Sequence, residues 1–173
     1  TNALKYGGHP PRIELGAGKT YLYGDQVFSG KADGASYRPI GLMHIQNCNY
    51  VELCGNGATL KLDPDGTDGH AFRVGAFNPE TGEPGPGGTT NRDLRAGVAQ
   101  LVFSDVAALH VENLTIDGSN ERVELGGTWG AAGYQVSGSN LVIRGTTRCS
   151  IENVHTHHAV KDGLYIDTNV PGH

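Results

Sequence analysis

Short alternations of hydrophobic and polar residues recur along this chain, and two stretches of eighteen residues align without a gap. Residues 101–118 lie over residues 141–158 at a constant offset of 40. Leu, Val, Glu and Asn are identical at four aligned positions, and apolar character is kept where identity is lost. Alternation with a period of two is typical of half-buried β-strands. We therefore predict one β unit that is used repeatedly and buries its apolar face against its neighbours.

A third copy lies upstream, because residues 45–55 overlay residues 103–113 at an offset of 58. The glycine- and proline-rich run 78–91 and the mixed run 119–132 separate the copies, and we predict that both are loop insertions. No stretch shows a convincing helix period. The pattern predicts an all-β solenoid of stacked strands.

Composition supports one domain and excludes some partners. The chain has 173 residues, 27 of them glycine, and a net charge of −5 without a basic cluster. That balance argues against nucleic acid and against anionic membrane surfaces as partners. No apolar run approaches the roughly 20 residues of a membrane-spanning helix. Three cysteines are too few for a disulfide framework, and Cys149 takes an inward position of the repeat, so we expect it to be buried.

The chain stops at His173, where another coil of the solenoid is expected. We expect residues 1–173 to form a single β-helix domain that is incomplete at its C-terminal end. An open solenoid end exposes unpaired strand edges and an apolar core. The remaining part of a longer solenoid, or a second copy of the chain, would cover it.

Several segments resemble the right-handed parallel β-helix of the pectate-lyase-like superfamily. They are residues 51–60 (VELCGNGATL), 113–118 (NLTIDG), 153–156 and 13–21. The resemblance implies a protein that acts on a polysaccharide bound along the outward face of the stacked strands. Lyases, glycoside hydrolases, epimerases and non-catalytic adhesins or tail fibres share this fold. It also implies an extracellular or periplasmic location.

In such a solenoid, asparagines at one corner of successive coils bond to each other through their side-chain amides. Asn113 and Asn153 are aligned and are predicted to form such a ladder. Gly55 stands at the equivalent place of the earlier copy and should break it.

Most residues that could take part in catalysis lie in the last coil. Alternation sends His155 and His157 outward on one face, beside Thr115 and Asp117 of the previous coil. His157 with an outward Asp117 suits acid/base catalysis or metal binding, and a solvated histidine pair is the alternative. A metal site needs a third convergent ligand, and the spacing fixes none.

The Asp162-Gly163 pair resembles the Asp-Gly rung of polygalacturonase-type glycoside hydrolases, where the aspartate takes part in catalysis. Only Asp162 matches, whereas ordinary glycoside hydrolysis needs two carboxylates. A simple turn into the next strand is the competing interpretation.

A lyase or epimerase would instead need a base and a group that neutralises the uronate, such as Ca²⁺. Tyr165 and Asp167 should project outward near Lys161, which suits this chemistry and equally suits sugar binding without turnover. The residues expected to carry catalysis are therefore Asp162, His157, His155, Lys161 and Tyr165. Those expected to bind substrate are Asp117, Asp167, Trp129, Arg73 and Gln135. The alternative function is that of a non-catalytic glycan-binding or structural β-helix.

Overall fold

The computed structural model describes residues 12–23, 25–28, 37–40, 43–63, 73–76, 95–96, 98–126 and 138–167. Within these ranges the protein is all-β, with a single short 3₁₀ helix, η4 (Asn120–Arg122), and no α-helix. No described helix has the length and apolar character needed to cross a membrane. The all-β class predicted from the alternation is confirmed.

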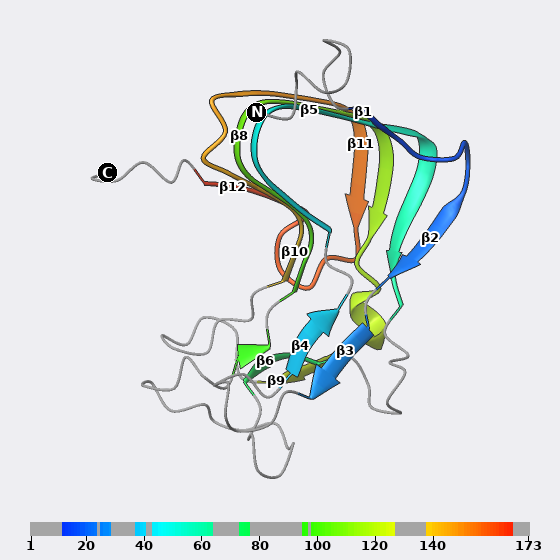
Figure 1. The fold of residues 1–173 in the computed structure, drawn as a ribbon. Coiled ribbons are helices and arrows are strands. Elements are labelled where there is room, and N and C mark those ends of the chain that lie inside the picture. The colour runs from blue at the N-terminus through cyan, green and yellow to red at the C-terminus, as the bar shows by residue number, and fades with distance from the viewer. Residues whose placement is uncertain are drawn as a thin grey trace.

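One parallel sheet winds through successive coils of a solenoid, as Figure 1 shows. The first coil holds β1 (Arg12–Glu14) and β2 (Thr20–Tyr23), and the second is the long β5 (Met43–Leu62). The third is β8 (Val98–Asp117), and the fourth holds β10 (Gly138–Arg144) and β11 (Arg148–His157). β12 (Leu164–Asp167) begins the next coil on β10. Every pairing in this sheet is parallel, so each coil lies directly on the one before it.

The internal repeat sets the register of this stacking. Leu141 pairs with Leu101 and Val154 pairs with Leu114, which is the offset of 40. Met43 also pairs with Leu101, which is the offset of 58. Aligned positions of the sequence are therefore neighbours in space, about 4.8 Å apart across parallel strands.

The core is the stack of inward side chains of the second to fourth coils. Leu101, Phe103, Leu141 and Ile143 are almost completely buried. Burying such a side chain stabilises a fold by about 1.5–3 kcal/mol. The last described strand, β12, is less buried, and Leu164 and Ile166 are 42% and 60% exposed.

Left-handed residues turn the coils at the same corners. Asn113 and Asn153 have φ of 53° and 51°, and the Asn153 amide donates to the Asn113 side-chain oxygen at 3.2 Å. The predicted asparagine ladder is therefore present. The second coil has a bulge at this corner, where Asn56 (φ 52°) bonds to the Leu15 carbonyl instead. Gly55 lies against the Asn113 backbone, where a Cβ would collide with the Asn113 carbonyl oxygen.

Further strands lie outside the solenoid, towards the bottom of Figure 1. β3 (Asp25–Phe28) and β4 (Tyr37–Ile40) form an antiparallel pair that the alternation did not predict. β6 (Arg73–Ala76) pairs with both β7 (Arg95–Ala96) and β9 (Glu124–Gly126).

Two expectations about loops and burial change. The predicted insertion 119–132 is not simply a loop, because its described part forms η4 and then β9, whose pairing with β6 supplies backbone hydrogen bonds. The insertion 78–91 lies outside the described residues.

Cys149 was predicted to be buried and is exposed. It pairs with the buried Leu109, but no described strand lies on the far side of β11 to cover it.

Candidate functional site

The predicted pairing of the last two coils is found residue by residue. His155 lies beside Thr115 and His157 lies beside Asp117 in the β11–β8 register. Asp117 stands on the outward side of β8, as predicted, but only 7% of it is exposed. Its carboxylate is covered by neighbouring side chains, so its chemistry is set by them and not by bulk water.

A second histidine completes the group. The Nδ1 atom of His158 lies 3.1 Å from Oδ1 of Asp117, and Nδ1 of His157 lies 3.6 Å from the same oxygen. The two Nδ1 atoms are 2.8 Å apart. Asp117, His157 and His158 thus direct three donor atoms at one small volume, and we call them the Asp-His-His cluster.

Local backbone geometry brings His158 into the cluster. β11 ends at His157, and His158 adopts a left-handed φ of 48°. Strict alternation would direct its side chain away from that of His157, and the turn reverses this. Gly118 permits the close approach, because a Cβ there would collide with the His158 carbonyl oxygen.

Asp117 is held from both sides. The Ser119 backbone N–H donates to its Oδ1 at 3.0 Å, and Lys61 Nζ lies 3.2 Å from Oδ2. Burial raises the pKa of Asp117, but the hydrogen bonds from Ser119, Lys61 and His158 outweigh burial. The pKa of Asp117 therefore lies below its ordinary value, and the carboxylate is ionised at neutral pH.

The buried Asn140 and the partly buried Tyr23 lie close to the cluster. Asn140 donates its amide to the carbonyl oxygens of Ile116 and His157, at 3.1 and 2.8 Å, and so ties the ends of β8 and β11 together. Tyr23 packs against Leu62, Val123 and Val160. Burial, and next the charge of Asp117, raise the pKa of the Tyr23 phenol.

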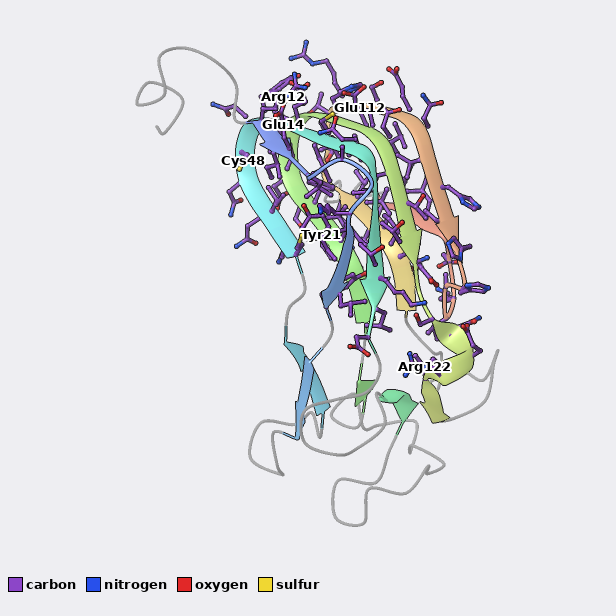
Figure 2. All side chains as sticks on the ribbon, turned by 90° about the vertical axis from the view of Figure 1, so that its right-hand side faces the viewer. Arg12, Glu14, Tyr21, Cys48, Glu112 and Arg122 are labelled. Atoms are coloured by element: carbon purple, nitrogen blue, oxygen red, sulfur yellow. The ribbon has the colours of Figure 1, made fainter. Side chains whose placement is uncertain are left out.

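Two rows of outward side chains cross β2, β5, β8 and β11, and Asp117 and His157 of the cluster belong to one of them. One row is Thr20, Thr59, Thr115 and His155, and the other is Leu22, Lys61, Asp117 and His157. Figure 2 looks onto these strands, with Arg122 of η4 beyond the strand ends. The ring centroids of His155 and His157 are 5.0 Å apart. Apart from Leu22, the side chains of both rows are polar, and they repeat across the coils at the spacing of parallel strands.

The remaining predicted residues form a second group on β10, β12 and the segment before β12. Tyr165 is 36% exposed, with the Arg144 guanidinium 5.9 Å and Lys161 Nζ 5.7 Å from its ring centre. Lys161 also lies 3.4 Å from Asp162, whose carboxylate accepts a weak bond from Ser139. Asp167 pairs with Arg144 in the β12–β10 register. We call Arg144, Lys161, Asp162 and Tyr165 the tyrosine group.

Three predicted substrate-binding residues fall elsewhere. Arg73 begins β6, which belongs to the small sheet with β7 and β9 and not to a coil of the solenoid. Its predicted role in substrate binding stays a prediction. Trp129 and Gln135 lie outside the described residues, so their predicted roles stay predictions.

A charged cluster at the opposite end of these strands has a simpler explanation. Arg12 lies 2.7 Å from Glu14 and 3.1 Å from Glu52. Figure 2 shows Arg12 and Glu14 at the edge where the strands turn, together with Glu112. The Arg12–Glu14 pair lies within β1, and the Arg12–Glu52 pair joins two neighbouring coils. Partly exposed ion pairs of this kind contribute modestly to stability.

Sequence reasoning missed His158, Lys61, Asn140 and Arg144. The run His155-Thr-His-His158 held a usable signal, since its last histidine directly follows the strand and aligns with Gly118. A glycine at that place in the previous coil indicates a close approach of backbones.

Comparison with known proteins adds no family. No protein-family model matches the chain, and neither the curated proteins nor the solved structures gave a match.

Proposed function

We propose that this chain is a carbohydrate-active solenoid of the pectate-lyase-like type, which binds an acidic polysaccharide along its outward face and cleaves it by β-elimination. The observation that carries the proposal is the exposed Tyr165 with Arg144 and Lys161 beside its ring. Aromatic faces bind the apolar faces of sugar rings, and guanidinium groups bind carboxylates through two parallel hydrogen bonds. This combination matches a chain of uronic acids.

The carboxylates that already form ion pairs favour β-elimination over hydrolysis. Hydrolysis needs one carboxyl group as a protonated acid. Asp117 is ionised beside Lys61, and Asp162 is ion-paired with Lys161. β-Elimination needs a base and cationic groups beside the uronate, and the tyrosine group contains both.

In the proposed step a base removes the C5 proton of a uronate. The electron pair forms a C4–C5 double bond as the C4–O bond breaks, and the leaving oxygen takes up a proton. We assign the uronate carboxylate to Arg144 and the proton transfer to Tyr165. In this assignment the Tyr165 phenolate takes the C5 proton and the resulting phenol gives it to the leaving O4, while Lys161 stays with Asp162. Such a protein would meet its polymer outside the cell or in the periplasm.

A panel of polygalacturonate, alginate and a neutral glucan tests the proposal. β-Elimination gives ultraviolet absorbance from the unsaturated product, whereas hydrolysis gives new reducing ends without it. Retention of the polymer without either product would favour the non-catalytic alternative, which the regular outward rows of threonine and charged residues also suit.

Matched variants identify the residues. Tyr165→Phe keeps the ring and removes the hydroxyl, so turnover should fall by about 100-fold or more while the polymer is still retained. Arg144→Gln should weaken retention of acidic polymers. Arg148→Gln is the control, because Arg148 is an exposed arginine on β11, outside the tyrosine group. Full turnover in Tyr165→Phe would exclude the assigned role of this residue.

A further inference from the structure

The Asp-His-His cluster has the spacing of metal ligands. Oδ1 of Asp117 and the Nδ1 atoms of His157 and His158 form a triangle with sides of 3.1, 3.6 and 2.8 Å. We propose that these three residues bind one divalent transition-metal ion such as Zn²⁺. The proposal stands on this geometry and does not depend on the proposed polysaccharide chemistry.

The triangle fits an ion of ordinary size. Zinc binds histidine nitrogen and carboxylate oxygen at about 2.0–2.2 Å, so neighbouring donors stand about 3.3 Å apart in a tetrahedron and about 2.9 Å apart at right angles. The three observed separations straddle these values. An ion could therefore bind on one side of the triangle with adjustments of the side chains alone.

Hydrogen bonds among the three side chains satisfy their donor atoms less well than a bound metal cation does. Each neutral imidazole carries one proton, on Nδ1 or on Nε2. Two Nε2 protons leave both Nδ1 lone pairs facing each other beside a carboxylate, and two Nδ1 protons oppose each other across 2.8 Å. One shared Nδ1 proton satisfies part of the triangle. A cation on its axis attracts all three donor atoms at once.

Neighbouring groups hold the ligands in place. Lys61 binds Oδ2 of Asp117 and so keeps Oδ1 turned towards the histidines. Asn140 fixes the His157 backbone through its carbonyl oxygen. Support of this kind orients ligands and commonly changes metal affinity by 10–100-fold.

The donor set selects the class of ion. Two imidazole nitrogens and one carboxylate suit Zn²⁺, Fe²⁺, Co²⁺ or Ni²⁺, whereas Ca²⁺ takes six to eight oxygens. The Ca²⁺ that the lyase resemblance implies is therefore not the ion expected at this cluster. The side chain of His158 is 53% exposed, so solvent reaches the cluster. Three protein ligands with further positions open to water are typical of catalytic, not structural, zinc sites.

Calorimetric titration with Zn²⁺ tests the site on the full chain, without a polyhistidine tag and after treatment with a chelator. We expect one zinc ion per chain, and with Co²⁺ the visible absorption of a nitrogen-ligated ion. His158→Asn removes the ligand but retains a residue that tolerates a left-handed φ. It should raise the dissociation constant by at least about tenfold, as should His157→Gln.

His155→Gln is the matched control, because His155 lies on the same strand but outside the cluster. Its affinity should stay within about twofold of the wild type, since it is not a ligand. Circular dichroism establishes whether each variant is folded. If His157→Gln does not fold, His158→Asn tests the proposal alone, because the His158 side chain is exposed. A folded wild type that does not bind Zn²⁺, or a His158→Asn variant that binds it as tightly, would overturn the proposal.

Discussion

The side-chain amide of Asn153 donates a hydrogen bond to the side-chain oxygen of Asn113 in the neighbouring coil, and both residues have the same left-handed backbone conformation. Alanine at position 113 would lose this bond and strain the backbone, since left-handed φ costs most residues about 1–2 kcal/mol. We expect Asn113→Ala to lower the free energy of unfolding by about 1–3 kcal/mol, the hydrogen bond contributing about 1. Urea denaturation measures this.

Asn113→Gly separates the two contributions, because glycine adopts the left-handed conformation without strain. Asn113→Gly should lower the free energy of unfolding by less than Asn113→Ala does. Asn153→Gly should add little once Asn113 has been replaced, because the hydrogen bond is already lost and glycine tolerates the left-handed φ of Asn153. A glycine variant as unstable as the alanine variant would mean that the conformation is not what asparagine supplies here.

Gly55 is needed for close contact with the next coil. A Cβ at this position would collide with the Asn113 carbonyl group and with the Leu114 side chain. Gly55→Ala should therefore destabilise the fold by about 1–3 kcal/mol, as overpacking of a core does. Gly16→Ala is the control, because its nearest neighbours belong to the side chains of Lys19 and Tyr21. Thermal unfolding of the two variants compares them, and equal losses would contradict the contact argument.

The repeat made most of the solenoid predictable. Offsets of 40 and 58 residues became strand registers, because a parallel solenoid places equivalent residues of successive coils side by side. The β3–β4 pair was not predictable in the same way. Its strands have four residues each and no counterpart elsewhere in the chain, so no repeat marks them.

The candidate site was predictable only where it follows the strands. The pairing of His157 with Asp117 came from alternation and the repeat. His158 joins the cluster through a left-handed turn after the strand ends, where alternation no longer applies. Lys61 belongs to a coil 56 residues before Asp117, and the bulge at Gly55 hides that register from a simple overlay.

Thiol labelling tests the burial of the cysteines. Cys149 is exposed on β11, whereas Cys54 is buried in the second coil. We expect iodoacetamide to modify Cys149 in the folded protein and Cys54 only after unfolding. Partial burial raises the pKa of Cys149, so its reaction should need a higher pH than that of a free thiol. Mass spectrometry of peptides gives the order, and earlier labelling of Cys54 would contradict the structure.

Acid should remove the stabilisation that the Asp117 carboxylate supplies. Its pKa is lowered in the folded protein by Ser119, Lys61 and His158, against the raising effect of burial. A carboxylate with a depressed folded pKa stabilises the fold above its unfolded pKa of about 4, and this stabilisation is lost as the pH falls towards the folded pKa. We expect the wild type to lose more stability between pH 6 and pH 3 than Asp117→Asn does, by urea denaturation with a chelator present.

Lys61→Gln provides the second arm of the acid experiment. Removing the ammonium leaves burial less opposed, so the pKa of Asp117 should rise towards its ordinary value or above it. The loss of stability between pH 6 and pH 3 should then be smaller than in the wild type and close to that of Asp117→Asn, although Asp117 itself is unchanged. If Lys61→Gln and the wild type have the same pH profile, the Lys61–Asp117 ion pair at 3.2 Å does not govern the ionisation of this carboxylate.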